Sequence, residues 1–177
     1  MTKTLTNKTK LEIFDSFTKT EYYQKLIAIC PLLGNVNIVV VDYKESEYKQ
    51  ASGFNNNDAL VCHIPKRESN DSPIYAEILT NEDMIHKLNL SENEIFAAIA
   101  HEIGHIIINV ETKGKIKFPE EIEEIWCDNY ACQIGLAESM CSLLHKLLDK
   151  GESLLLSQKI LILIRITKIN DYILCHS

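Results

Sequence analysis

The sequence predicts a single α+β domain, with a small mixed sheet in its N-terminal half and helices in the remainder. The chain has 177 residues, of which 46% are hydrophobic and 24% charged, which is typical of one globular domain with a buried core. Strand-like segments are concentrated between positions 36 and 79, whereas helical periodicity dominates after position 81. No internal repeat is present, so residues 1–177 are expected to form one unit.

The first expected elements are one or two amphipathic helices within Lys10 to Ile29, where apolar residues alternate with charged ones. Pro31 and Gly34 then end the helical pattern. The segments with strand character are Val36 to Tyr43, Glu47 to Phe54, Ala59 to Ile64 and Ile74 to Leu79. Pro73 precedes the last of these strands, a position that suits an edge strand. We therefore expect Ile74 to Leu79 at an edge of the sheet.

The strongest helix signal in the chain begins at Ser91. Ser91 and Glu94 form an S-x-x-E capping box, in which each residue satisfies a backbone N–H of the other. Leu90 and Ile95 flank the cap as a hydrophobic staple. Apolar residues at helical spacing continue the pattern, so the helix is expected to run to about Ile108.

The following helices have clear boundaries. Pro119 suits the first turn of a helix that should end at Gly135. The apolar run Ile160 to Ile164 is far shorter than the roughly 20 residues that span a bilayer, and Lys159 and Arg165 flank it. We interpret this run as part of a buried helix. The other expected helices are Glu82 to Leu88, Glu138 to Leu148 and Glu152 to Ile173.

Charge and cysteine content limit the expected partners and compartment. Acidic residues outnumber basic ones by 25 to 18, and with a formal charge of −7 neither nucleic acid nor an anionic membrane is expected as a main partner. Met1 to Lys10 lacks the apolar run of a secretory signal, so a cytoplasmic protein is expected. The six cysteines include no C-x-x-C pair and are expected to be reduced thiols rather than zinc ligands.

A metal-binding motif lies within the helix that begins at Ser91. His101-Glu102-Ile103-Gly104-His105 reads H-E-x-x-H, and residues four apart lie on one helix face, so His101 and His105 can bind one ion. Zinc lowers the pKa of a bound water from near 16 to about 7, and Glu102 is placed to accept its proton as general base. Gly104 has no side chain, which lets another backbone approach the metal. The motif predicts a catalytic zinc site.

A third protein ligand is normal for catalytic zinc, and the helix after Pro119 carries the candidates. Its acidic residues are Glu120, Glu121, Glu123, Glu124 and Asp128. Glu124 is favoured because Asp128 follows it by four residues on the same helix face. In such an E-x-x-x-D pair the glutamate binds the metal, and the aspartate accepts the ring N–H of a ligand histidine.

These two segments resemble a known peptidase family. His101 to His105 together with Glu124 to Asp128 are similar to the gluzincin metallopeptidases, and the chain length resembles that of the minigluzincins. The stretch Glu124 to Leu136 resembles the glutamate helix of HtpX-like peptidases, although no segment here resembles their membrane spans. The ImmA/IrrE-like peptidases are comparable in size but usually have Asn where Asp128 stands, followed by Phe-Ala and Leu-Met-Pro patterns absent here. The resemblance covers about Ser91 to Leu136.

The resemblance implies a zincin-like fold, in which the edge strand of a small sheet binds substrate beside two metal-binding helices. It also implies His101, His105 and Glu124 as zinc ligands and Glu102 as general base. Asp128 would then support a ligand histidine through a hydrogen bond.

An extended peptide substrate is expected to add to the edge of the sheet, where main-chain hydrogen bonds supply affinity. The expected edge is Ile74 to Leu79. The residues expected to line the cleft beside Glu102 are Tyr75, Ala76 and Glu77. The rival edge is Ala59 to Ile64, with His63 in the cleft. Cys62 could cap the zinc as an inhibitory thiolate, and the open candidates for stabilising an oxyanion are His145, Tyr75 and Tyr130.

The leading functional hypothesis is a zinc metallopeptidase that hydrolyses peptide bonds in a restricted protein or peptide substrate. A chain of this length lacks a second domain that would complete a deep cleft, so general degradation is disfavoured. The alternative is a non-enzymatic or regulatory protein-binding domain that retains a zinc site. Glu102 argues against a purely structural site, because such a site has no need of a general base.

Overall fold

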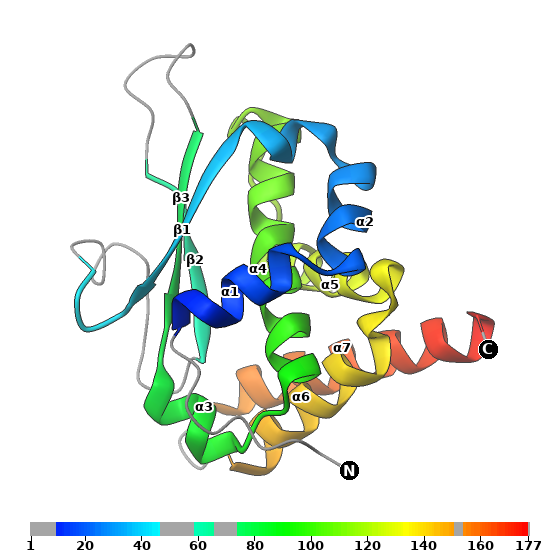
Figure 1. Cartoon of the computed structure of the whole chain (residues 1–177). Coiled ribbons are helices and arrows are strands. Elements are labelled where there is room, and N and C mark those ends of the chain that lie inside the picture. The colour runs from blue at the N-terminus through cyan, green and yellow to red at the C-terminus, as the bar shows by residue number, and fades with distance from the viewer. Residues whose placement is uncertain (1–9, 47–58, 66–73, 151–153, 177) are drawn as a thin grey trace.

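The computed structural model describes residues 10–46, 59–65, 74–150 and 154–176. It is an α+β structure, in which a three-stranded mixed sheet lies on one side of a larger group of helices (Figure 1). The elements in chain order are α1 (Lys10–Thr18), α2 (Glu21–Ile29), the 3-10 helix η1 (Pro31–Asn35), β1 (Val36–Asp42), β2 (Leu60–His63), β3 (Ile74–Thr80), α3 (Glu82–Leu88), α4 (Glu92–Thr112), α5 (Glu120–Ala131), the turn η2 (Cys132–Leu136), α6 (Ala137–Lys150) and α7 (Leu156–His176).

The N-terminal amphipathic segment forms two helices rather than one. Thr20 separates them and caps α2, because its hydroxyl oxygen accepts a hydrogen bond from the N–H of Tyr23 at 3.5 Å. Phe17 of α1 and Leu26 of α2 are fully buried, so both helices contribute to the core. The strand expected at Val36 to Tyr43 is confirmed as β1. The strand expected at Glu47 to Phe54 lies outside the described residues.

The strand order of the sheet corrects the expected edge. β3 is the central strand, because β1 pairs with it in parallel and β2 pairs with it antiparallel. The expectation that Ile74 to Leu79 forms an edge is therefore wrong. Proline lacks only its own backbone N–H, and Pro73 precedes the first paired residue, Ile74. Pro73 therefore does not determine how many strands pair with β3. Burial of every residue from Ala76 to Thr80 is typical of a central strand, and β2 takes the edge position within the described sheet.

Helix α4 is the central element of the core and begins at the predicted cap. The Ser91 N–H donates to Glu94 Oε2 at 2.6 Å, and the Glu94 N–H donates to Ser91 Oγ at 3.4 Å, which completes the capping box. Leu90 and Ile95 are both buried, as a staple requires. The helix continues to Thr112, one turn beyond the expected end, and contacts β2, α5 and α6.

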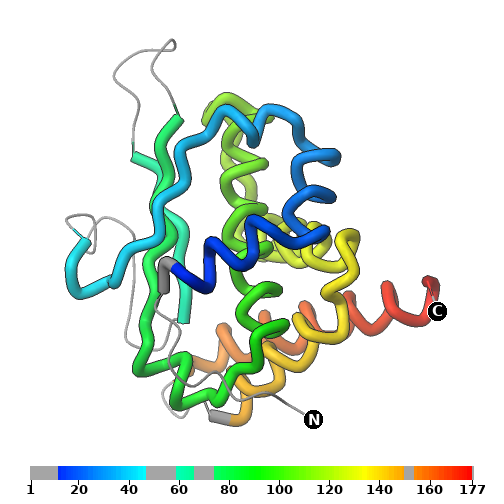
Figure 2. Tube along the Cα trace, in the orientation of Figure 1, coloured from blue at the N-terminus to red at the C-terminus, as the bar shows by residue number. Residues whose placement is uncertain are grey.

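In the C-terminal half, α5 and α6 pack against α4, and α7 packs against α5 and α6. Helix α5 begins after Pro119, and the chain kinks at Gly135, whose φ of +99° favours glycine, before continuing as α6. The chain trace shows α7 lying along α6 and extending away from the sheet at its C-terminal end (Figure 2). Among the described residues, no helix has the length and apolar composition that crossing a membrane requires.

Candidate metal centre

The centre of the site is the close contact between α4 and α5. A Cβ atom at Gly104 would lie only 2.8 Å from the Cα atom of Cys127, so any larger residue would force the two helices apart. The absence of a side chain at Gly104 thus lets the α5 backbone approach the histidine-bearing turn of α4. This contact brings the H-E-x-x-H motif beside the E-x-x-x-D segment.

The two motif histidines are each held by a carboxylate of α5. His101 Nδ1 lies 2.8 Å from Asp128 Oδ1, and His105 Nδ1 lies 2.8 Å from Glu123 Oε1. A carboxylate accepts only a protonated ring nitrogen, so both Nδ1 atoms carry hydrogen and both Nε2 atoms are left for another partner. The two rings lie with their centroids 5.2 Å apart, close enough to share one ion.

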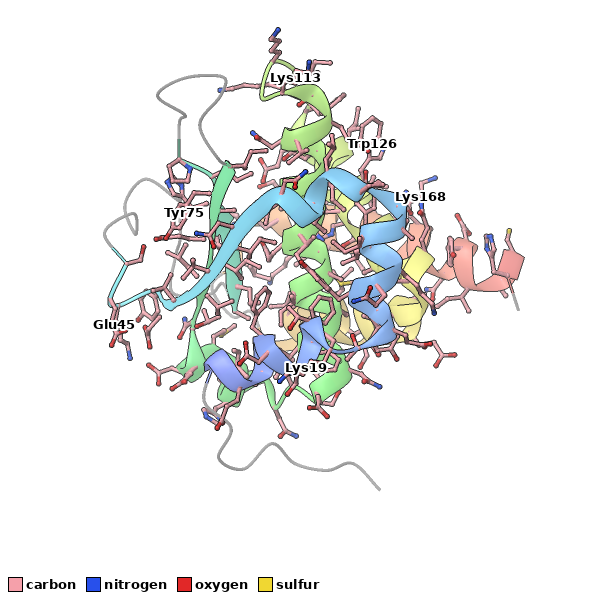
Figure 3. All side chains as sticks on the ribbon, turned by 45° about the horizontal axis from the view of Figure 1, so that its top comes forward. Lys19, Glu45, Tyr75, Lys113, Trp126 and Lys168 are labelled. Atoms are coloured by element: carbon pink, nitrogen blue, oxygen red, sulfur yellow. The ribbon has the colours of Figure 1, made fainter. Side chains whose placement is uncertain are left out.

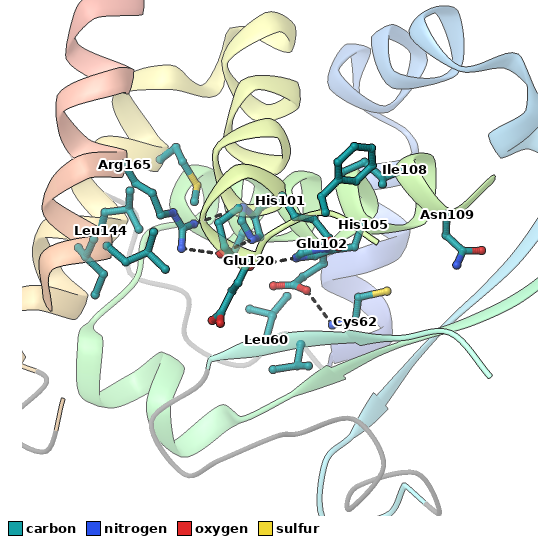
Figure 4. Close-up of a pocket in the computed structure, with 18 of the residues that line it drawn as sticks. Leu60, Cys62, His101, Glu102, His105, Ile108, Asn109, Glu120, Leu144 and Arg165 are labelled. Atoms are coloured by element: carbon teal, nitrogen blue, oxygen red, sulfur yellow. Dashed lines mark hydrogen bonds and ion pairs between the residues drawn. The ribbon is translucent and has the colours of Figure 1, made fainter. Parts of the chain in front are cut away.

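Glu124 lies beside the Nε2 atoms of both histidines. Its Oε2 atom is 3.4 Å from His101 Nε2, and its Oε1 atom is 3.5 Å from His105 Nε2. The Glu124 carboxylate therefore lies close to both imidazoles, with a different oxygen nearest to each Nε2 atom. Figure 4 shows the motif side chains of His101, Glu102 and His105 at this site.

A buried thiol offers a further ligand atom. One ligand atom from each of His101, His105 and Cys127 lies within 4.8 Å of the others, so this cluster could hold a metal ion. The Cys127 side chain is fully buried and packs under Gly104, where a Cβ atom would lie 3.1 Å from Cys127 Sγ. Burial raises the pKa of the Cys127 thiol, and the neighbouring carboxylates, led by Glu124, raise it further. The metal-free thiol is therefore neutral.

Neighbouring charges outweigh burial in setting the pKa values of His101 and Glu124. Burial alone would lower the pKa of His101, but the Glu124 and Asp128 carboxylates outweigh burial and raise it to about 10. Burial would likewise raise the pKa of Glu124, yet His101, His105 and Arg165 hold it well below its usual range. The metal-free His101 is thus protonated at neutral pH, and a metal ion that binds Nε2 must displace a proton.

Arg165 of α7 completes the group and was not among the residues expected at the site. Its Nε and Nη2 atoms donate to the two oxygens of Asp128, both at 2.7 Å, and its Nη1 donates to Glu124 Oε2 at 2.7 Å. Arg165 is only 9% exposed. A charged residue directly after the apolar run of the last helix is the signal that could have indicated a buried partner.

Glu102 faces the edge of the sheet. Glu102 is 8% exposed, and its Oε2 atom accepts a hydrogen bond from the Cys62 N–H at 2.7 Å (Figure 4). The Asn81 N–H donates to the Ala59 carbonyl, which makes these two residues a hydrogen-bonded pair of the β2–β3 ladder. Ladder bonds alternate along an antiparallel pair, so the backbone groups of Leu60 and Cys62 point away from β3 and toward the site.

An open cleft of about 750 Å³ lies over the site between β2, α4, α6 and α7. Its floor includes His101, Glu102, His105 and Glu124, and Arg165 lies at one side. Apolar residues of α6 and α7 also line the cleft, namely Met140, Leu143, Leu144, Leu147, Leu161 and Ile162. An aliphatic wall beside a few polar groups is typical of a ligand-binding site.

Several expected cleft residues lie elsewhere. Residues of the described chain that line the cleft do not include Tyr75, Ala76 or Glu77, so the expectation that they do is wrong. Tyr75 donates to Glu77 Oε1 at 2.8 Å, and Figure 3 shows Tyr75 on the side of the sheet away from the helices. His63 pairs opposite Glu77 and is also absent from the lining, whereas Cys62 is part of it.

The oxyanion candidates named from the sequence are not in the lining of the described cleft either, since His145 lies exposed on α6 and Tyr130 lies on α5 outside the wall. The sequence identified Glu123 only as a possible metal ligand. In the structure it makes a hydrogen bond with His105 Nδ1, as Asp128 does with His101 Nδ1. No spacing rule distinguished Glu123 from the other acidic residues of its helix, because the difference depends on which face meets α4.

Comparison of the chain with protein-family models, with curated proteins and with solved structures finds no significant match.

Proposed function

We propose that this chain is a zinc-dependent peptidase of the gluzincin type, in a zincin-like arrangement. One observation carries the proposal: the Nε2 atoms of His101 and His105 lie 3.4 and 3.5 Å from the two oxygens of Glu124, in a cleft that Glu102 also lines. Nitrogen and carboxylate ligands on two helices, with space on the cleft side for water and substrate, suit catalytic zinc.

The charge of the site also suits a divalent cation. Four carboxyl groups surround the two imidazoles, and Arg165 supplies one positive charge against two of them. A divalent ion between the imidazoles would offset part of the remaining negative charge. The four carboxyl groups belong to Glu102, Glu123, Glu124 and Asp128.

Glu124 is a better third ligand than Cys127 for a catalytic ion. Glu124 lines the cleft and faces both Nε2 atoms, whereas Cys127 is fully buried and is not part of the described lining. A catalytic ion needs a coordination position open to substrate. An ion held by Glu124 is therefore closer to the cleft than one held by Cys127.

The residues around the ion account for hydrolysis. When bound, zinc polarises the substrate carbonyl and makes water acidic enough to be deprotonated near neutral pH. Glu102 accepts the proton and passes it to the leaving amine. Because the Cys62 N–H occupies Oε2 of Glu102, the proton is taken by Oε1. An extended peptide adds to β2 through the backbone groups of Leu60 and the carbonyl of Cys62, because the Cys62 N–H is bonded to Glu102.

A non-enzymatic domain that holds a metal ion is the second candidate. The His101, His105 and Cys127 cluster favours it, because cysteine and histidine together are common ligands of structural zinc. A buried structural site has no use for the adjoining 750 Å³ cleft or for a carboxylate beside it, which is why we rank this candidate second.

Two measurements on the unmodified protein test the proposed function. Zinc titration with a competing chromophoric chelator should give one site of micromolar or tighter affinity. A peptide library should then be cleaved by the zinc-loaded protein, with cleavage lost on chelation and restored by added zinc. One bound zinc ion without cleavage of any library peptide would favour the structural-site candidate, and the absence of zinc binding would contradict both candidates.

The β2 edge gives a prediction about substrate binding. Replacing Cys62 by proline removes the N–H that holds Glu102, while the ladder to β3 uses the alternate residues. We expect zinc affinity to be retained and cleavage to fall about 10- to 100-fold, because a hydrogen bond to a charged group contributes about 1.5–3 kcal/mol. Cys62→Ala keeps the N–H and serves as the control. Equal cleavage rates in the two variants would contradict this role of β2.

A further inference from the structure

Arg165 lies at the point where the last helix meets the metal-binding helices. It is 9% exposed, although its neighbours along α7 are almost all aliphatic. Its guanidinium makes three hydrogen bonds of 2.7 Å, two to Asp128 and one to Glu124. Burying this charge is unfavourable unless such partners are present, so the helix and the two carboxylates depend on one another.

We propose that Arg165 is a positioning residue of the metal centre. It holds Glu124 in the orientation that faces the Nε2 atoms of His101 and His105, and it holds Asp128 against the Nδ1 atom of His101. The inference rests on the proposed function, in which Glu124 is the third ligand. It adds that α7, which lies outside the motif helices, determines the geometry of the ligand set.

The hydrogen bonds divide the two oxygens of Glu124 between separate partners. Oε2 accepts from Arg165 Nη1 at 2.7 Å, whereas Oε1 faces His105 Nε2 at 3.5 Å. A charge-assisted hydrogen bond to one oxygen restrains the carboxylate and leaves the other oxygen without a bond to the guanidinium. Arg165 thus restrains the carboxylate whose two oxygens face the Nε2 atoms of His101 and His105.

Asp128 receives a second, two-pronged interaction from the same guanidinium. Arg165 Nε and Nη2 each donate to a different oxygen, which is the fork geometry that distinguishes arginine from lysine. Asp128 Oδ1 also accepts from His101 Nδ1 at 2.8 Å, so the arginine orients the carboxylate that orients the histidine. Two of the three proposed ligands are thus controlled by one side chain.

The packing of α7 against α5 and α6 places the Arg165 side chain at the site. Ile162, Ile166 and Ile169 are buried on the same side of the helix as Arg165, and α7 contacts both α5 and α6. These apolar contacts hold the arginine at its place. Lys168, less than one turn further along, is exposed at the periphery of the molecule (Figure 3) and offers a matched control for the loss of a positive charge from the same helix.

The decisive measurement is metal affinity without substrate. Arg165→Met should weaken zinc binding about 10- to 100-fold, the range typical of residues that orient metal ligands, while Lys168→Met should leave it unchanged. Arg165→Lys should fall between them, because an ammonium restores the charge but cannot bond both carboxylates in the same geometry. If Arg165→Met does not fold, as judged by circular dichroism, Arg165→Lys supplies the comparison.

The absorption spectrum of the cobalt(II) form separates positioning from a merely structural role. A changed position of Glu124 should alter the visible bands of bound cobalt in the Arg165 variants and leave those of Lys168→Met as in the unmodified protein. Unchanged zinc affinity together with an unchanged cobalt spectrum in Arg165→Lys and in the folded Arg165→Met would overturn the inference. Zinc binding without peptide cleavage in the unmodified protein would overturn the peptidase proposal while leaving this inference intact.

Discussion

Replacing Glu102 by glutamine should reduce peptide hydrolysis by at least 10²- to 10⁴-fold, because the amide cannot accept the proton of the attacking water. The substitution is nearly isosteric, and its side-chain oxygen can still accept the hydrogen bond that the Cys62 N–H makes to Oε2 at 2.7 Å. Zinc affinity should therefore stay close to that of the unmodified protein. The comparison requires kcat/KM on one defined peptide and a zinc titration of the same preparation.

Glu111→Gln provides the matched control for that experiment. Glu111 lies on the same helix, near its C-terminal end, and is exposed. This variant should cleave the peptide at the rate of the unmodified protein, so that loss of activity in Glu102→Gln cannot be attributed to the charge of the helix. Hydrolysis at the unmodified rate by Glu102→Gln would exclude Glu102 as general base.

The second large effect is expected when a metal ligand is removed. His101→Ala or His105→Ala deletes one of the two nitrogens that face Glu124, and the stoichiometric zinc site should be lost. A metal that binds only the folded state stabilises it by about 2.7 kcal/mol at 100 times its Kd. Added zinc should therefore raise the Tm of the unmodified protein and leave the Tm of both variants unchanged. The exposed His86 gives the control, His86→Ala.

Three further variants in the same titration identify the third ligand. Glu124→Ala should weaken zinc binding far more than Glu121→Ala, because Glu121 is exposed on the same helix. Cys127→Ala removes the competing thiol of the buried cluster. Loss of zinc in Cys127→Ala with retention in Glu124→Ala would show that the ion lies on the buried side, and would favour a structural site.

The sequence by itself determined the features that depend on residues close together in the chain. The cap at Ser91 and the four-residue spacing of His101 and His105 are local properties of one helix, and both are present in α4. The spacing of Glu124 and Asp128 likewise predicted two carboxylates on one face of α5. Both reach the motif histidines, at 3.4 and 3.5 Å for Glu124 and at 2.8 Å for Asp128.

Only the tertiary structure decided which strand lies at the edge and which charges meet. Strand order depends on pairings between segments far apart in the chain, so Pro73 gave no information about the two neighbours of β3. The edge next to Glu102 is β2, and its donor is a backbone N–H that no side-chain pattern reveals. Arg165 reaches Asp128 and Glu124 across 37 and 41 positions. These long-range contacts form because the packing of α7 on α5 buries the charged side chains together. They cannot be predicted from residue spacing within one helix.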